Sequence, residues 1–218
     1  MKNFCKMYKW LILGGGVLFL LAGCASFTTF QTPEVLEKGE LSMGLGAAGL
    51  MLMESSGPTI GIGSTDFFTR YGLGANTDVG LKLSGIFPFI VLAGDVKHQL
   101  WKKPIALSLD LGASYFVLDQ FQTFGIYPMI LLGAKPFFAG FRISHLIISE
   151  ASNTSGFPFY SSSDATTATI PNVVVGMYIG KRFQVIPEIN YYLNTTGDRF
   201  IFFGMGIQYK WGGEKSKK

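Results

Sequence analysis

Apolar and polar residues alternate with a period of two along most of the chain after residue 38. In the clearest run, residues 105–116, the odd positions are apolar, except that Ala113 is small, and most even positions are small or polar. Successive side chains of a β-strand point to opposite faces, so this period predicts strands rather than helices. Similar runs predict ten strands, approximately 39–50, 59–73, 78–86, 89–100, 105–117, 123–134, 137–148, 169–180, 183–192 and 200–211.

Two prolines count against parts of this prediction. Pro128 and Pro187 fall inside predicted strands, and proline normally occupies strand edges or bulges because it has no N–H to donate. A third, Pro171, lies near the start of the eighth strand, whose alternation is blurred. The strand count is therefore about ten, within a range of about 8–12.

The connections between the strands indicate how they are joined. The links at 74–77, 101–104, 135–136 and 181–182 are short, and those at 149–167 and 193–199 are longer. Alternating short and long links are typical of an up-and-down antiparallel transmembrane β-barrel with periplasmic turns and outer loops. An even strand number brings both ends of the barrel to the short-turn side, so we expect both termini to be periplasmic.

The first 23 residues differ from the rest of the chain. Lys2, Lys6 and Lys9 precede a short apolar run, residues 10–21, which small residues follow. This order predicts a signal-peptide helix, because the run is too short for the ~20 residues of a spanning helix. After residue 23, no stretch of 18 apolar residues is uninterrupted, so a closed barrel is the remaining way to cross a lipid bilayer.

The tetrad Leu21-Ala22-Gly23-Cys24 resembles the lipobox of bacterial lipoproteins. The resemblance implies cleavage before Cys24 and a covalent lipid on that residue, which is the only attached group we expect. Ala25 and Ser26 stand where lipoproteins of the inner membrane typically have Asp, which implies export by the lipoprotein-sorting machinery to the outer membrane. The other cysteine, Cys5, leaves with the signal peptide, and so the mature chain has no disulfide.

Four segments follow from these patterns. We expect a lipoprotein signal peptide (1–23), a polar, Thr-rich, lipid-anchored tether (24–38), a β-barrel (39–211) and a charged periplasmic tail (212–218). The whole chain has 18 basic and 14 acidic residues, but three of the lysines belong to the signal peptide. The mature chain is therefore nearly neutral and has no basic patch for nucleic acid.

The polar face of the predicted strands carries mostly Gly, Ser, Ala and Asn, with few charges. Charged residues make up only 15% of the chain, and Gly is abundant at 28 residues. These features favour an apolar face toward lipid and a narrow lumen. Aromatic residues near strand ends predict an interfacial girdle, namely Phe137, Phe183, Tyr191, Tyr209 and Trp211. A soluble lipocalin-like lipoprotein, with the apolar face inside, is the alternative.

The region 30–211 resembles bacterial outer-membrane β-barrel families, and the entry at 30–40 is similar to that of their lipoprotein members. The resemblance lies in alternating Gly and aromatic residues and in short turns, as in Tyr71-Gly72-Leu73-Gly74-Ala75-Asn76-Thr77-Asp78. It implies outer-membrane lipids and the barrel-assembly machinery as partners. Many such barrels end on an aromatic residue, whereas Trp211 is followed by GGEKSKK here.

Polar and ionisable side chains on the inward face form the candidate site. We expect a lumen polar network of Lys82, Asp95, Lys97, Asp110, Arg142, Gln184, Glu188, Gln208 and Lys210. Isolated charges in a narrow lumen are costly, so these groups are expected to pair and fill the barrel. The alternative is a narrow pore or small-ligand carrier that uses the same polar lumen.

Catalytic and metal-binding patterns are weak, and we expect no enzyme activity. The chain has two histidines, His98 and His145, and Ser144 points to the face opposite His145. A lipid-modifying enzyme that uses His145 is a remote alternative. No spacing typical of metal ligands occurs.

The long connection 149–167 is the best candidate for a surface contact. Phe157, Phe159 and Tyr160 are aromatic residues in a polar frame and are candidates to bind an extracellular ligand. The alternative is that they fold over the barrel mouth. The sequence therefore predicts an outer-membrane β-barrel lipoprotein with a structural or surface-interaction role.

Overall fold

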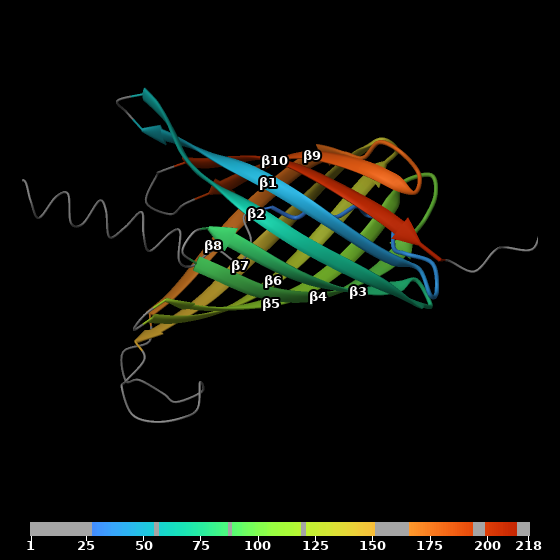
Figure 1. The fold of residues 1–218 in the computed structure, drawn as a ribbon, viewed down its shortest axis with the longest axis horizontal. Helices are drawn as coiled ribbons and strands as arrows, with labels where there is room; N and C mark the ends of the chain where they lie inside the picture. The colour runs from blue at the N-terminus through green and yellow to red at the C-terminus, as the bar shows by residue number, and fades with distance from the viewer. Residues whose placement is uncertain are drawn as a thin grey trace, which may run out of the picture.

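Ten antiparallel strands close into a barrel, because the last strand pairs with the first (Figure 1). The computed structural model describes residues 28–54, 57–86, 89–118, 121–150, 166–193 and 199–212. The strands are β1 (Leu41–Glu54), β2 (Gly57–Gly74), β3 (Thr77–Ile86), β4 (Phe89–Trp101), β5 (Ala106–Leu118), β6 (Phe121–Ala134), β7 (Phe137–Glu150), β8 (Thr166–Met177), β9 (Phe183–Leu193) and β10 (Arg199–Trp211). The predicted ten-stranded up-and-down barrel is confirmed.

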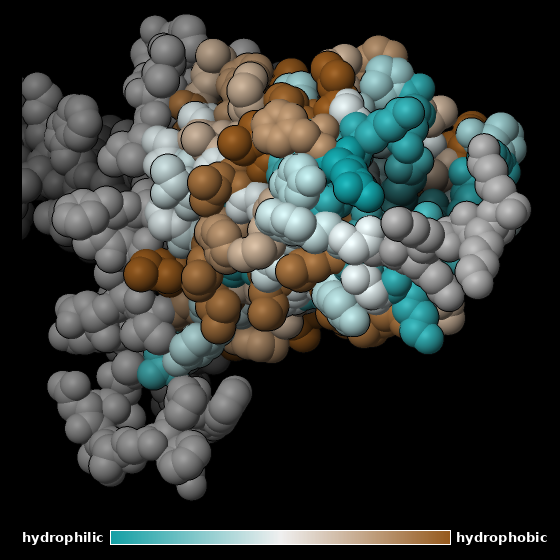
Figure 2. Space-filling view, turned by 45° about the vertical axis from the view of Figure 1, so that its right-hand side comes forward, coloured by the Kyte–Doolittle hydropathy of each residue, from teal (hydrophilic) through white to brown (hydrophobic). Residues whose placement is uncertain are grey.

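The alternation in sequence becomes an inside-out distribution of side chains. In β5, Ser108 and Asp110 are buried in the lumen, whereas Leu109 and Leu111 are 44% and 59% exposed on the outer surface. Figure 2 shows apolar side chains over the middle of the outer surface and polar ones toward one end. A soluble barrel would show the reverse arrangement, so the exterior fits lipid rather than water.

The barrel has two different ends. At one end of the barrel, β2 is connected to β3, β4 to β5, β6 to β7 and β8 to β9, and we call this the short-turn end. We call the opposite end the long-loop end. At the short-turn end, Ala75 and Asn76 turn the chain between β2 and β3 with φ of 48° and 59°. β10 also ends here, so the C-terminal end of the described chain lies at the short-turn end (Figure 1).

The prolines explain the main irregularity of the sheet. β8 and β9 pair continuously over five residues, from Asn172↔Tyr192 to Gly176↔Glu188, and an isolated bridge, Ile179↔Val185, follows beyond the end of β8. Pro171 directly precedes Asn172 in β8, and Pro187 directly precedes Glu188 in β9. The two prolines therefore flank the paired segment, and neither has an N–H to continue the ladder. β8 therefore ends at Met177, not at 180 as predicted, and begins earlier, at Thr166.

The segment before β1 lies inside the barrel. Phe30 and Leu36 are 1% and 5% exposed, and residues 28–38 run along the lumen to the short-turn end. We call residues 28–38 the lumen plug. The expectation of a tether between lipid and barrel did not anticipate this path, because the partners of the segment lie far away in the sequence. The predicted signal peptide and Cys24 lie outside the described residues.

No helix in the described part of the chain is long and apolar enough to cross a membrane.

Candidate functional site

The N-terminal part of the lumen plug is held by one carboxylate from β9. Glu188 is 3% exposed and lies at the middle of its strand. Its Oε1 accepts a hydrogen bond from the Thr29 backbone N–H at 2.6 Å, and its Oε2 accepts from the Thr29 hydroxyl at 2.7 Å. The Phe30 N–H donates to Oε2 at 2.8 Å, and the Asn190 side chain donates to Oε1 at 2.7 Å. A buried charge with four donors is well satisfied, so it fixes the backbone of the plug.

Thr28 is held by a second pair of charges, which come from β2 and β3. The Lys82 ammonium donates to the Thr28 carbonyl and hydroxyl oxygens, both at 2.8 Å. The Thr28 hydroxyl donates in turn to Asp66 Oδ2 at 2.5 Å, and Lys82 lies 3.4 Å from the same oxygen. The plug thus bridges a buried ion pair rather than merely filling space beside it.

Phe30 is the apolar anchor of the plug. Its ring stacks on Phe68 with centroids 5.6 Å apart, and the Lys82 ammonium lies 5.0 Å from the ring centroid. The ring fits against glycines of β1 and β10, because a Cβ at Gly46 would lie 2.1 Å from Phe30 Cε2 and one at Gly206 would lie 2.7 Å from Cδ1. Part of the high glycine content therefore makes room for the plug.

A second charge cluster lies nearer the short-turn end of the lumen, and we call it the lower cluster. Arg70 Nη2 lies 2.5 Å from Asp78 Oδ1 and 2.7 Å from Asp95 Oδ1. Lys97, which is 1% exposed, lies 3.6 Å from Asp78 Oδ2. Opposite charges alternate in this cluster, so the buried groups compensate one another.

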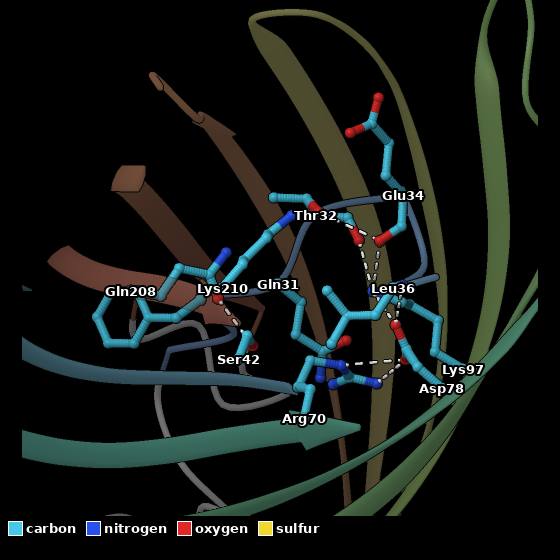
Figure 3. A pocket seen from close by; sticks show the side chains of 11 residues that line it. Gln31, Thr32, Glu34, Leu36, Ser42, Arg70, Asp78, Lys97, Gln208 and Lys210 are labelled. Atoms are coloured by element: carbon cyan, nitrogen blue, oxygen red, sulfur yellow. Dashed lines mark hydrogen bonds and ion pairs between the residues drawn. The ribbon is translucent and has the colours of Figure 1, made fainter. Parts of the chain in front are cut away.

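The plug completes the same cluster from its own side. The Leu36 N–H donates to Asp78 Oδ2 at 2.9 Å, and Lys97 donates to the carbonyl oxygens of Thr32 and Glu34 at 2.8 and 3.0 Å. Figure 3 shows Arg70, Asp78 and Lys97 gathered around the plug residues. Backbone atoms of the plug therefore supply partners for barrel charges at both levels of the lumen.

An ion pair at the short-turn end joins the plug to the turn between β6 and β7. Glu34 Oε2 lies 2.9 Å from the Lys135 ammonium, which in turn lies 5.7 Å from the centroid of the Tyr178 ring. Burial raises the pKa of the Tyr178 hydroxyl, and the nearby Glu34 carboxylate raises it further. The side chains of Glu34 and Lys135 are 33% and 61% exposed, so this ion pair adds little to stability.

Two small cavities lie beside the plug. One cavity of about 10 Å³ lies beside Gln31, Arg70 and Lys97, and another of about 20 Å³ lies beside Thr28 and Arg142. A single water needs roughly 10–15 Å³ when volume is measured this way, so each holds about one water molecule. Neither of these two cavities has room for a small organic ligand.

The structure places most of the predicted lumen residues on the inner face. Seven of them are buried there, namely Lys82, Lys97, Asp110, Arg142, Gln184, Glu188 and Gln208. Asp95 and Lys210 are partly buried. Gln208 donates to Gln184 Oε1 at 2.6 Å, and the Arg142 guanidinium donates to the Tyr192 hydroxyl. Arg142 also lies 5.8 Å from the Tyr127 ring centroid.

Three charged lumen residues were missed from the sequence. Asp66, Arg70 and Asp78 are 2%, 7% and 0% exposed, and Arg70 and Asp78 form the tightest ion pair of the lower cluster. The signal was present, because Asp66 and Arg70 alternate with the apolar outward residues Phe67 and Tyr71. The period of two in residues 66–71 by itself therefore places Asp66 and Arg70 on the inner face.

Catalytic groups do not converge in the described residues. His145 is exposed on the outer face, with Nδ1 2.9 Å from the Thr169 hydroxyl, whereas Ser144 is buried in the lumen. His98 lies at the short-turn end beside Thr77. No group of three metal-binding side chains occurs in the described part of the chain. Three predicted surface residues, Phe157, Phe159 and Tyr160, lie outside the described residues.

Comparisons with known proteins give a likeness of architecture. No family model matches the chain, and no curated protein matches it significantly. Among solved structures, an outer-membrane channel from Pseudomonas putida F1 aligns at 8% identity and a TM-score of 0.48, covering 84% of this chain and 100% of the other. Neisserial surface protein A aligns at 13% identity and a TM-score of 0.38, covering 80% of this chain and 100% of the other. The attachment invasion locus protein Ail of Yersinia pestis aligns at 10% identity and a TM-score of 0.33, covering 80% of this chain and 99% of the other. Likeness at this level says nothing of what this chain binds.

Proposed function

We propose that the protein is an outer-membrane β-barrel lipoprotein with a structural or surface-interaction role and no catalytic activity. The observation that carries the proposal is the lumen plug, whose residues occupy the lumen and provide hydrogen-bond partners for Glu188, Lys82 and Lys97. A barrel that is filled by its own chain is a rigid membrane platform. The part that can contact a partner is then the connection between β7 and β8, which is the longest in the barrel.

Two features support the membrane location. The outer face is apolar, with Leu81 and Leu111 60% and 59% exposed. At the short-turn end, the aromatic residues Trp101, Phe137 and Trp211 are 63%, 61% and 45% exposed, where an interfacial girdle is expected. With the short turns in the periplasm, the long connection between β7 and β8 faces outward, and lipid on Cys24 adds an anchor. The barrel-assembly and lipoprotein-sorting machineries are the expected partners during export.

The loop at 149–167 is the proposed contact for an extracellular ligand. In the structure β7 ends at Glu150 and β8 begins at Thr166, so this connection spans residues 151–165 and is the longest in the barrel. Replacing Phe157, Phe159 and Tyr160 by Ser tests this role by the binding of purified protein to host or bacterial surface glycans. Unchanged binding would remove these aromatic residues from the proposal.

A narrow pore that opens when the plug moves is the second candidate. It is favoured by the polar nature of the contacts, since hydrogen bonds to charged barrel residues hold the plug around Phe30. Displacement of the plug would expose the charges of Lys82, Lys97 and Glu188 to the lumen. The first candidate predicts a permanently closed lumen, so the two differ in conductance.

Conductance in planar bilayers separates the candidates. The purified full chain is compared with a variant lacking residues 28–36 and with Arg142→Ala. The structural role predicts no steady conductance for the full chain and for Arg142→Ala, and ion conductance after removal of the plug. Steady conductance of the full chain that changes in Arg142→Ala would overturn the closed lumen. Heat-modifiable mobility on gels is the control that each variant forms a barrel.

Anchoring needs its own experiment. Cys24→Ala removes the proposed lipid, and the matched control is Cys5→Ala, which changes the signal peptide but leaves the lipobox. Labelling with a radioactive fatty acid is expected for the wild type and Cys5→Ala, and not for Cys24→Ala. Equal labelling of all three chains would contradict lipidation at Cys24.

A further inference from the structure

Basic side chains are distributed unevenly over the barrel. Of the Lys and Arg side chains that the structure describes, four are buried in the lumen, namely Arg70, Lys82, Lys97 and Arg142. The others are exposed or partly exposed, and all of them lie at the short-turn end: Lys38, Lys102, Lys103, Lys135, Lys181, Arg182 and Lys210. The exposed positive charge of the described residues is therefore concentrated at one rim.

Most of these cations lie side by side around the rim. β5 begins beside the end of β6, with Ala106 opposite Gly133, so the β4–β5 and β6–β7 turns are neighbours. The Tyr178 N–H donates to the Pro136 carbonyl oxygen at 2.8 Å, which brings the β8–β9 turn beside the β6–β7 turn. The Lys210 N–H donates to the Arg182 carbonyl oxygen at 2.9 Å, which adds the end of β10. We call the continuous set the basic arc: Lys102, Lys103, Lys135, Lys181, Arg182 and Lys210.

Each part of the basic arc adjoins an exposed aromatic residue of the outer face. The neighbouring pairs are Trp101 and Lys102, Lys135 and Phe137, Arg182 and Phe183, and Lys210 and Trp211. The four aromatic side chains are 45–63% exposed. Aromatic rings at the ends of membrane strands lie at the level of the lipid headgroups, and long basic side chains beside them carry their charges to the same level. The basic arc therefore lies where the phosphate groups of a bilayer lie.

Acidic side chains at this rim do not neutralise the basic arc. Glu34, Glu37 and Glu40 belong to the plug and to the residues just before β1, and the turns of the arc contain no acidic residue. Among the described residues, Lys135 is the one member of the arc that forms an ion pair, with Glu34 at 2.9 Å. The arc therefore has an excess of positive charge that attracts anions.

We infer that the basic arc binds the headgroups of anionic phospholipids, such as phosphatidylglycerol, in the leaflet that surrounds the short-turn end. This inference rests on the proposed membrane location. A Lys or Arg side chain near an anionic lipid surface is attracted to its phosphates, whereas a zwitterionic headgroup also carries a cation that repels it. The arc thus gives the barrel a preference for one class of lipid and helps to fix its depth in the bilayer.

Two tryptophans report on the lipids at the arc, because Trp101 adjoins Lys102 and Trp211 adjoins Lys210. The full chain with Trp10→Phe is folded into mixed vesicles of phosphatidylglycerol and phosphatidylcholine, in which one of the two lipids is brominated near the headgroup. Quenching by each brominated lipid gives the ratio of the two association constants. We expect phosphatidylglycerol to bind about 2–5 times more tightly, since one headgroup contacts about one cation of the arc at a time.

A neutral variant and a charge-retaining variant test whether the arc causes this preference. The neutral variant carries Lys102→Gln, Lys103→Gln, Lys181→Gln and Arg182→Gln, and its ratio should fall to about 1. The matched control exchanges the same positions for the other basic residue, with Lys102→Arg, Lys103→Arg, Lys181→Arg and Arg182→Lys. Its ratio should stay close to that of the wild type.

The outcomes separate the inference from the proposed function. A wild-type ratio of about 1, or the same ratio in the wild type and the neutral variant, would overturn lipid binding by the arc. Quenching of the wild type by aqueous iodide without any quenching by brominated lipid would instead contradict the proposed membrane location. Heat-modifiable mobility shows that each chain is folded. If the neutral variant does not fold, the Lys102→Gln/Lys103→Gln and Lys181→Gln/Arg182→Gln pairs are measured separately.

Discussion

The Glu188 carboxylate accepts hydrogen bonds from both the backbone N–H and the hydroxyl of Thr29, 159 positions earlier in the chain. This contact joins the middle of β9 to the segment that precedes the barrel. Because Glu188 is 3% exposed, water does not readily replace Thr29 as its hydrogen-bond partner. Loss of this contact therefore costs free energy of folding. The stability of the barrel and the position of the plug are therefore coupled, and the following predictions use that coupling.

Removal of the Glu188 carboxylate should loosen the plug. Glu188→Ala leaves the N–H groups of Thr29 and Phe30 without their acceptor, at a cost of about 1–3 kcal/mol for each buried group. We expect a loss of about 2–5 kcal/mol in the free energy of unfolding, measured by urea titration of gel mobility in lipid vesicles. Glu188→Gln retains one acceptor oxygen and should lose less. Equal stability of the wild type and Glu188→Ala would contradict the role of this contact.

The close approach of Phe30 to Gly46 gives a test by compensation. A Cβ at Gly46 would lie 2.1 Å from the Phe30 ring, so Gly46→Ala should displace the ring and cost about 1–3 kcal/mol. Phe30→Ala in the same chain should remove the clash, so the double variant should be more stable than the sum of the two single changes predicts. Gly49→Ala is the matched control, because no heavy atom outside its neighbours lies within 4 Å of its Cβ position. If the losses of stability in the two single variants simply add in the double variant, the contact between Gly46 and the Phe30 ring is contradicted.

The charge cluster predicts a contrast between buried and exposed ion pairs. Arg70→Met removes the partner of Asp78 and Asp95 and should cost about 3–5 kcal/mol, because it leaves buried carboxylates poorly compensated. Adding Asp78→Asn should recover part of that loss. Lys135→Met breaks the exposed pair with Glu34 and should cost less than about 1 kcal/mol. Similar losses in Arg70→Met and Lys135→Met, in the same urea titration, would refute the buried network.

Tryptophan fluorescence tests whether the outer face meets lipid. Outside the predicted signal peptide, the chain has two tryptophans, Trp101 and Trp211, and each is the last residue of its strand at the short-turn end. In vesicles, both should be quenched by lipids brominated near the headgroup, and weakly by lipids brominated near the chain ends. Strong quenching by aqueous iodide without any quenching by brominated lipid would indicate a soluble barrel. Single Trp→Phe variants assign the signal to each position.

The fold could be predicted from the sequence because its information is local. Side chains alternate between the two faces of a strand, so the residues of a strand themselves show which side chains share a face. Short turns such as Gly74–Thr77 show which strands are adjacent. The inward position of Lys82 and Glu188 follows from the same period. The bounds of β8, Thr166–Met177, differ from the predicted 169–180, because Pro171 and Pro187 limit its pairing with β9.

The sequence alone determined the ten strands, the assignment of lumen-facing residues such as Lys82 and Glu188, and the apolar exterior. Only the tertiary structure decided that residues 28–38 fold into the lumen. A polar, Thr-rich segment has the same composition whether it is a solvated tether or a plug, because what distinguishes them is the partner of each polar group. Those partners, Lys82 for Thr28 and Glu188 for Thr29, are 54 and 159 positions away, and they come together only when the barrel closes.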